Sequence, residues 1–159
     1  VQIRLRFYHL MLQDPQTILN NQWPNNVALL RQARQSCQKI GLATMSYCPQ
    51  VRKILKILKL EDQFDFVASR DDVECGKPDP EIYLLVAHEL GFPPEECLVI
   101  EDSPAGVQAA LNAGMACIAV ATPFTNAALQ RKKILPKKWI VNDPDKLFEV
   151  VEKMLAAHS

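Results

Sequence analysis

CLVIEDSPAGVQAALNAGM, residues 97–115, is the stretch of this sequence that decides the fold. It opens with an apolar run of strand length, CLVI, as expected for a strand that helices cover on both faces. Ser103 and Pro104 then predict the start of a helix, and Gly114 predicts its end. One face of that helix carries only small residues, which would let it lie close to a sheet: Gly106, Ala109, Ala110 and Ala113.

Short apolar runs alternate with amphipathic helices along the rest of the chain. The other expected strands cover residues 40–45, 64–69, 117–121 and 139–141. The expected helices cover residues 26–39, 50–60 and 80–91, the third with Asp79 as its N-cap, and a last helix opens at Asp143. Strands separated by helices predict right-handed crossovers and a parallel sheet. The expected fold is therefore a three-layer, Rossmann-like α/β domain with helices on both faces of the sheet.

Length and charge exclude several classes of protein. The chain has 159 residues, with 18 Lys plus Arg against 18 Asp plus Glu, and a domain of this size can bury roughly 70% of its unfolded surface. Zero formal charge disfavours nucleic-acid binding through a basic face. No apolar run approaches the roughly 20 residues that span a bilayer. The five cysteines form no CxxC pair, which favours reduced thiols and a cytoplasmic protein.

Polar residues follow the expected strands at the edge where parallel sheets bind ligands. Thr44 and Ser46 end the first strand, Lys77 lies in the loop before a helix, and Glu101 and Asp102 end the third strand. Paired carboxylates suit a hard cation such as Mg²⁺. A hydroxyl and an ammonium beside such a cation make a site for phosphate, in which Thr44 and Lys77 donate to phosphoryl oxygens.

Each of these residues also has an ordinary structural interpretation. A threonine after a strand is often only a turn residue, and a lysine before Pro78 is often a solvated loop residue. The acidic pair before Ser103 could be a helix cap, because carboxylates favour the positive end of the helix dipole. The functional interpretation depends on the combination of these residues and not on any one of them.

Three motifs in order make the sequence resemble a known family. These are LATMS at residues 42–46, GKPDPEIYLLVAHELG at residues 76–91, and the segment 97–115 quoted above. Over roughly residues 24–155, the chain resembles the haloacid dehalogenase superfamily, in the branch of β-phosphoglucomutases and small phosphatases. The resemblance implies Mg²⁺-dependent phosphoryl transfer from a small phosphorylated metabolite, such as a sugar phosphate or a nucleotide-like compound.

The same resemblance implies a role for each of the polar residues. Thr44 and Lys77 would be catalytic and would hold the phosphoryl group, with Ser46 as a further phosphate-binding residue. Asp102, assisted by Glu101, would hold the metal ion. The paired acids favour phosphatases and mutases over the metal-free dehalogenases of the superfamily.

The first motif of that family, an apolar strand ending in Asp-x-Asp-x-Thr, does not occur in this sequence. It supplies the nucleophilic aspartate, and the one aspartate before Thr44 is Asp14 in MLQDPQT. We therefore expect residues 1–22 to be the remnant of a helical cap and residues 23–159 to be a core domain without its first strand. That strand would lie between the strands ending at Thr44 and Glu101, and this chain alone would not form an aspartyl-phosphate.

Several alternatives remain open at this point. Three interpretations of the absent motif are possible: a fragment of a longer protein, an incomplete reading frame, or a truncated protein. We prefer the first. A truncated domain would be a non-catalytic module that binds Mg²⁺, phosphate or a partner chain, and its unpaired sheet edges could promote self-association. Residues 1–7 alternate between apolar and polar and could replace the absent strand, although their polar positions do not suit a strand buried on both faces. The sequence separates neither phosphatase from mutase nor one substrate from another.

Overall fold

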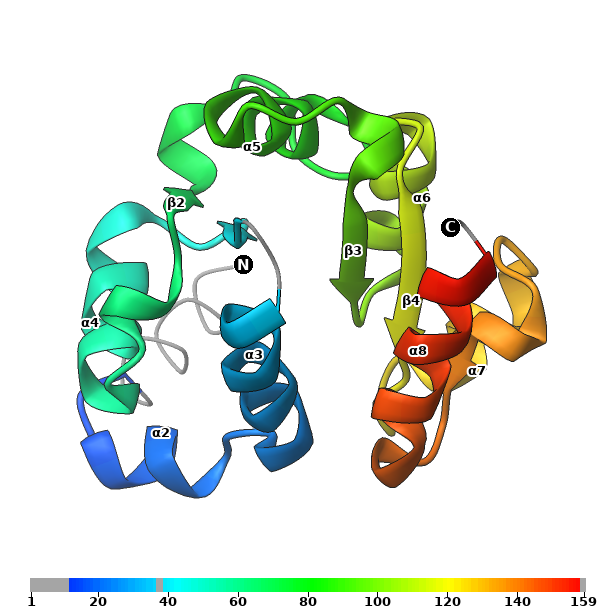
Figure 1. Ribbon diagram of the computed structural model, residues 1–159. Helices are drawn as coiled ribbons and strands as arrows, with labels where there is room; N and C mark the ends of the chain where they lie inside the picture. The colour runs from blue at the N-terminus through cyan, green and yellow to red at the C-terminus, as the bar shows by residue number, and fades with distance from the viewer. Residues whose placement is uncertain (1–11, 37–38, 158–159) are drawn as a thin grey trace.

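The computed structural model describes residues 12–36 and 39–157 (Figure 1). The helices are α2 (Pro15–Asn20), α3 (Pro24–Ser36), α4 (Cys48–Leu58), α5 (Glu81–Leu90), α6 (Pro104–Asn112), α7 (Asn126–Lys132) and α8 (Leu147–Ala157). The strands are β1 (Gly41–Ala43), β2 (Phe66–Ala68), β3 (Leu98–Glu101), β4 (Ala116–Val120) and β5 (Ile140–Val141). All five expected strands are present. The substitute strand suggested for residues 1–7 lies outside the described residues.

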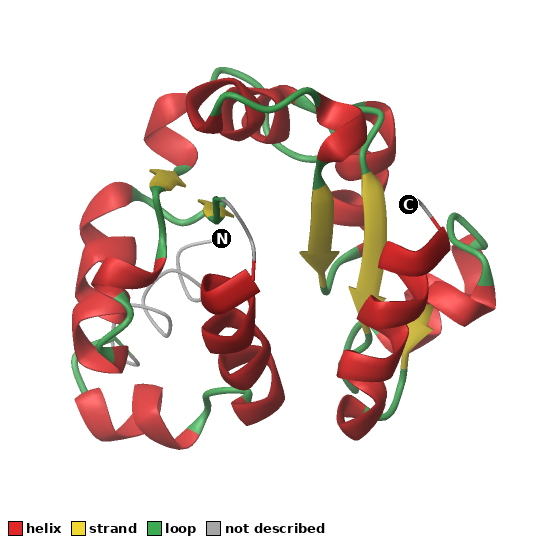
Figure 2. Cartoon of the chain, in the orientation of Figure 1, coloured by secondary structure: helices red, strands yellow, loops and turns green. Residues whose placement is uncertain are grey.

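The strands pair in parallel, as predicted, but they form two sheets and not one. β1 pairs with β2, and β3, β4 and β5 form a second sheet in that order. Figure 2 shows the two groups of strands on opposite sides of the molecule, with α5 lying across the top between them. Within the described chain, β1 and β3 each have one paired neighbour, so each keeps a free edge.

The middle strand of the larger sheet, β4, buries both of its faces. Cys117 and Ala119 belong to a core cluster with residues of α5 and α6, whereas Ile118 and Val120 pack with Leu147 of α8. Alternate residues of a strand point to opposite faces, so helices must cover both sides of this sheet. The predicted three-layer α/β architecture is confirmed.

The helix starts beside the carboxyl ends of the strands follow the sequence closely. The Ser103 hydroxyl accepts a hydrogen bond from the Gly106 N–H at 3.0 Å, which makes it the predicted N-cap of α6. α5 begins at Glu81, one residue later than predicted, with Pro80 in the cap position. Asp79 still accepts a hydrogen bond from the Glu81 N–H, at 3.0 Å, so the capping carboxylate is the predicted one.

The helix α7 was not predicted from the sequence, and α2 lies in the segment that was expected only as a remnant of a helical cap. Leu129 is the buried residue of α7, so no apolar stripe indicates a helix there. Arg131 and Lys132 lie in its last turn, where positive charge stabilises a helix. Among the residues that the structure describes, no helix has the length and apolar character needed to cross a membrane.

Candidate functional site

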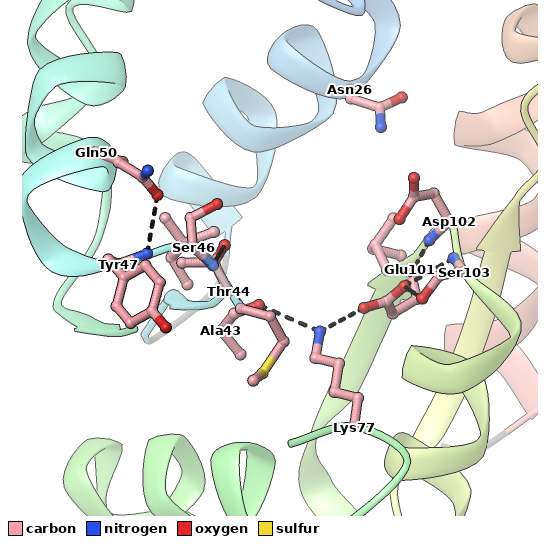
Figure 3. Close-up of a pocket in the computed structure, with 13 residues that line it drawn as sticks. Asn26, Ala43, Thr44, Ser46, Tyr47, Gln50, Lys77, Glu101, Asp102 and Ser103 are labelled. Atoms are coloured by element: carbon pink, nitrogen blue, oxygen red, sulfur yellow. Dashed lines mark hydrogen bonds and ion pairs between the residues drawn. The ribbon is translucent and has the colours of Figure 1, made fainter. Parts of the chain in front are cut away.

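A cavity of about 660 Å³ lies between the carboxyl end of β1 and that of β3 (Figure 3). Its walls include every residue that the sequence singled out for the site: Thr44, Ser46, Lys77, Glu101 and Asp102. These residues come from three separate segments of the chain. The expected convergence at one edge of the sheet is therefore present, although the sheet itself is divided there.

The loop after β1 is fixed by backbone hydrogen bonds. The Thr44 N–H donates to the Ala68 carbonyl at 2.9 Å, which continues the pairing with β2 by one residue. The Ser46 N–H donates to the Thr44 hydroxyl oxygen at 3.2 Å, and the Ser46 carbonyl accepts from the Arg70 N–H at 3.0 Å. The loop thus turns back on itself at the cavity wall, with Thr44 and Ser46 both facing the cavity.

Lys77 connects the two halves of the divided sheet. Its Nζ donates to the Ala43 carbonyl of β1 at 3.3 Å and to Glu101 Oε1 of β3 at 2.5 Å (Figure 3). A third acceptor, the Tyr83 hydroxyl, lies at 2.9 Å. The Lys77 and Glu101 side chains are only 10% and 8% exposed, so this is a buried ion pair, in which removal of one partner would be costly.

Both carboxylate oxygens of Glu101 accept hydrogen bonds. Oε1 accepts from Lys77 and, at 2.9 Å, from the Tyr83 hydroxyl. Oε2 accepts from the Asp102 N–H at 2.8 Å, the Ser103 N–H at 2.9 Å and the Ser103 hydroxyl at 3.0 Å. Burial favours the neutral carboxyl, but the Lys77 ammonium and these hydrogen bonds outweigh it and lower the pKa of Glu101. Glu101 is thus held as an anion that orients Lys77 and the turn carrying Asp102.

Asp102 differs from its neighbour. Its carboxylate points into the cavity, toward the side where Asn26 lies (Figure 3). Partial removal from water and the negative charge of Glu101 raise the pKa of Asp102, so a bound cation would relieve an unfavourable charge. A carboxylate in this environment fits a hard cation such as Mg²⁺. Among the described residues, no three acidic, histidine or cysteine side chains are placed to hold one metal ion, so Asp102 would leave most coordination positions to water or phosphate.

Two residues of the site were not identified from the sequence. Tyr83 lies on the buried side of α5. The sequence clue would have been its hydroxyl, because a buried tyrosine hydroxyl needs a hydrogen-bond partner. Asn26 of α3 lines the cavity, and its buried Oδ1 has no hydrogen-bond partner in the described part of the chain. A single asparagine in an amphipathic helix gave no sequence signal.

Comparison with known proteins adds to this geometry. A family model described as haloacid dehalogenase-like hydrolase matches residues 6–114. Hexitol phosphatase A of Escherichia coli K12 is 40% identical over 100 residues, which cover 63% of this chain and 46% of that protein. Beta-phosphoglucomutase of Bacillus subtilis 168 is 34% identical over 117 residues, which cover 70% of this chain and 51% of that protein.

Solved structures show the same likeness. The crystal structure of beta-phosphoglucomutase from Clostridium difficile superposes with a TM-score of 0.73 at 28% identity, over 87% of this chain and 58% of that chain. The present chain spans about half the length of the two curated relatives. The likeness therefore concerns only part of each relative.

Proposed function

Because this chain belongs to the haloacid dehalogenase-like hydrolase family, we propose that its site serves Mg²⁺-dependent phosphoryl transfer from a small phosphorylated carbohydrate. The observation that carries the proposal is the cavity between β1 and β3, which gathers two hydroxyls, an ammonium and two carboxylates. This set matches what a phosphoryl group and its metal ion require. The names of the hexitol phosphatase and the phosphoglucomutase support a sugar phosphate as substrate.

Thr44, Ser46 and Lys77 take the phosphate in this proposal. The two hydroxyls lie on the loop fixed against β2, so they present donors without further ordering of the backbone. Lys77 reaches the same cavity from the other side, where its charge offsets that of the phosphoryl oxygens. Holding the group from two sides orients it for attack, and orientation supplies a large part of many enzymatic rate enhancements.

Asp102 takes the metal ion, with Glu101 as its support. A bound Mg²⁺ would neutralise charge on the phosphoryl oxygens. Glu101 accepts a hydrogen bond from the Asp102 N–H and pairs with Lys77, so it fixes both charged groups while its own oxygens are engaged in hydrogen bonds. Such outer partners commonly orient the groups that bind a metal.

In this proposal, the nucleophile is supplied by a segment outside these 159 residues. These residues contain no Asp-x-Asp-x-Thr motif after an apolar strand, because the Asp-x-Asp at Asp143 and Asp145, which follows β5, has Leu147 in the place of the threonine. The cavity between the free edges of β1 and β3 has room at the place where a strand carrying that motif would end. The chain alone would then bind phosphate but not turn it over. Residues 23–159 would form the core domain, and residues 1–22 the end of a cap.

Compartment and assembly remain part of the proposal. The four cysteines that the structure describes are free thiols: Cys48, Cys75, Cys97 and Cys117. Free thiols are typical of a reducing compartment, which supports a cytoplasmic protein.

The free edges of β1 and β3 support self-association through strand pairing when no other segment covers them.

Hydrolysis of p-nitrophenyl phosphate tests the proposal. Two proteins are assayed, each with Mg²⁺ and with excess chelator. One is the 159-residue chain, and the other is a longer product that includes any coding sequence before Val1. We expect no turnover by the chain and Mg²⁺-dependent turnover by a longer product that carries Asp-x-Asp-x-Thr before Val1. Turnover by the 159 residues alone would refute the external nucleophile, and an inactive product with Asp-x-Asp-x-Thr would refute the enzyme.

A non-catalytic binding module is the second candidate, and the divided sheet is the observation that favours it. Two free strand edges facing one cavity can accept a strand from another chain by backbone pairing. Hydrogen exchange separates the candidates. A module would gain amide protection in β1 and β3 on adding its partner chain, and no product of the gene would hydrolyse phosphate esters.

A further inference from the structure

We propose that Tyr83 is a positioning residue of the phosphate site, whose hydroxyl fixes the Lys77 ammonium against Glu101. This inference rests on the proposed role of Lys77 in phosphate binding. It assigns a function to a side chain that lies outside the cavity wall and that the sequence did not single out.

The geometry is a closed triangle of hydrogen bonds. The Tyr83 hydroxyl accepts from Lys77 Nζ at 2.9 Å and donates to Glu101 Oε1 at 2.9 Å, and Lys77 donates to the same oxygen at 2.5 Å. The ring also lies under the ammonium, with Nζ 4.6 Å from its centroid, a distance at which a cation is attracted to the ring face. Tyr83 is only 6% exposed and belongs to the main core cluster, so packing holds the ring in place.

The burial of Tyr83 keeps its hydroxyl in the form that this triangle needs. Removal from water and the charge of Glu101 raise the pKa of the Tyr83 hydroxyl, so it stays protonated and can donate to the carboxylate. A neutral hydroxyl that accepts from one charge and donates to the other places both at set positions. A lysine side chain has four rotatable carbons and no preferred fork of its own, so this external support is what sets its direction.

The three acceptors of Lys77 are not equivalent. Its ammonium has three N–H groups, and the contact with the Ala43 carbonyl, at 3.3 Å, is the longest of the three. A phosphate oxygen entering the cavity would replace that carbonyl, whereas the Tyr83 and Glu101 contacts would hold Lys77 in place. Tyr83 therefore decides how much of Lys77 is already ordered before phosphate binds.

The test compares Tyr83→Phe with the unaltered 159-residue chain. The ¹H–¹⁵N signal of Lys77 Nζ is recorded by NMR at low temperature, and inorganic phosphate is titrated by calorimetry. We expect a protected Nζ signal in the unaltered chain, at least a tenfold faster hydrogen exchange in Tyr83→Phe, and about tenfold weaker phosphate binding. Phenylalanine keeps the ring and its packing, so the variant folds. Tyr47→Phe, at an exposed tyrosine on the cavity rim, serves as the control and changes neither quantity.

The outcomes separate this inference from the proposed function. An Nζ exchange rate unchanged in Tyr83→Phe overturns the positioning role, whatever phosphate does. Phosphate binding that is equally strong in Lys77→Met overturns the proposed function of Lys77, while the Nζ comparison still reports on Tyr83. Equal weakening by Tyr83→Phe and Tyr47→Phe also overturns the positioning role, because the effect would then not depend on contact with Lys77.

Discussion

Replacing Gly106 with alanine would create a steric clash with the Glu101 carboxylate. The new methyl carbon would lie well inside van der Waals contact distance of the carboxyl carbon and of both carboxylate oxygens. Gly106 is the third residue of α6 and is buried there. The Glu101 carboxylate cannot simply swing away, because five hydrogen bonds hold its two oxygens. Moving it breaks the ion pair with Lys77, so the substitution reaches the site through packing alone.

The magnitude follows from two opposing terms. Alanine is favoured over glycine inside a helix by up to about 1 kcal/mol. Breaking a buried ion pair costs about 3 to 5 kcal/mol, and Lys77 and Glu101 are both at most 10% exposed. The net loss is about 2 to 4 kcal/mol, which lowers the midpoint of thermal unfolding of a domain of this size by about 5 to 15 °C.

Urea unfolding followed by circular dichroism measures the free energy, and calorimetric titration of phosphate measures the effect on the site. Gly76→Ala is the matched control, because its new methyl group would meet only the flexible end of Met45, at 3.0 Å. We expect that control to lose less than about 1 kcal/mol and to bind phosphate normally. If Gly106→Ala is as stable as the unaltered chain and keeps its phosphate affinity, the close packing of Glu101 against α6 does not hold.

Three further predictions concern other parts of the structure. Gly41→Ala would drive a methyl group into Val86 of α5, and we expect about 1 to 3 kcal/mol of destabilisation in urea; no loss would mean that α5 can move away from β1. The hydrogen bond from Arg34 lowers the pKa of Asp65 to about 2. The stabilisation of the folded chain by this ion pair is therefore complete above about pH 4 and is lost as the pH falls through 2. The gap in stability between the unaltered chain and Asp65→Asn should therefore narrow between pH 4 and 2, and a constant gap would contradict the pairing. Asp102→Asn removes a charge that repels Glu101, so we expect unfolding at an equal or higher temperature without Mg²⁺ and no rise on adding Mg²⁺; a rise equal to that of the unaltered chain would take Asp102 out of the metal site.

The strands and the site residues could be predicted from the sequence because their signals are local. Apolar runs indicated the five strands, and positions at strand ends placed Thr44 and Asp102 at one edge, which Lys77 reaches from the loop before α5. The helix α7 carries one buried residue, so periodicity had nothing to detect. Gly106 was predicted to allow close approach to a sheet, and its neighbour proved to be the Glu101 side chain.

The different roles of the two acids could not be predicted from their spacing. Glu101 and Asp102 are adjacent in sequence and look equivalent as metal ligands. Only the fold turns one toward Lys77 and Tyr83 and leaves the other facing the cavity. The Lys77–Tyr83 contact joins residues six apart across a loop and a helix start, where no periodicity applies.

The turnover of a phosphate ester by variants of the longest active product of this gene tests the assignment of the site most directly. Thr44→Val, Lys77→Met and Asp102→Asn each remove one group that faces the cavity, and Gln50→Ala alters its rim without removing a proposed partner of phosphate or metal. Removal of one group that stabilises charge in a transition state commonly lowers kcat by about 10² to 10³. We predict a loss of kcat/KM of at least about a hundredfold for the three site variants and little change for Gln50→Ala. Activity retained in Lys77→Met and Asp102→Asn would contradict phosphoryl transfer at this cavity.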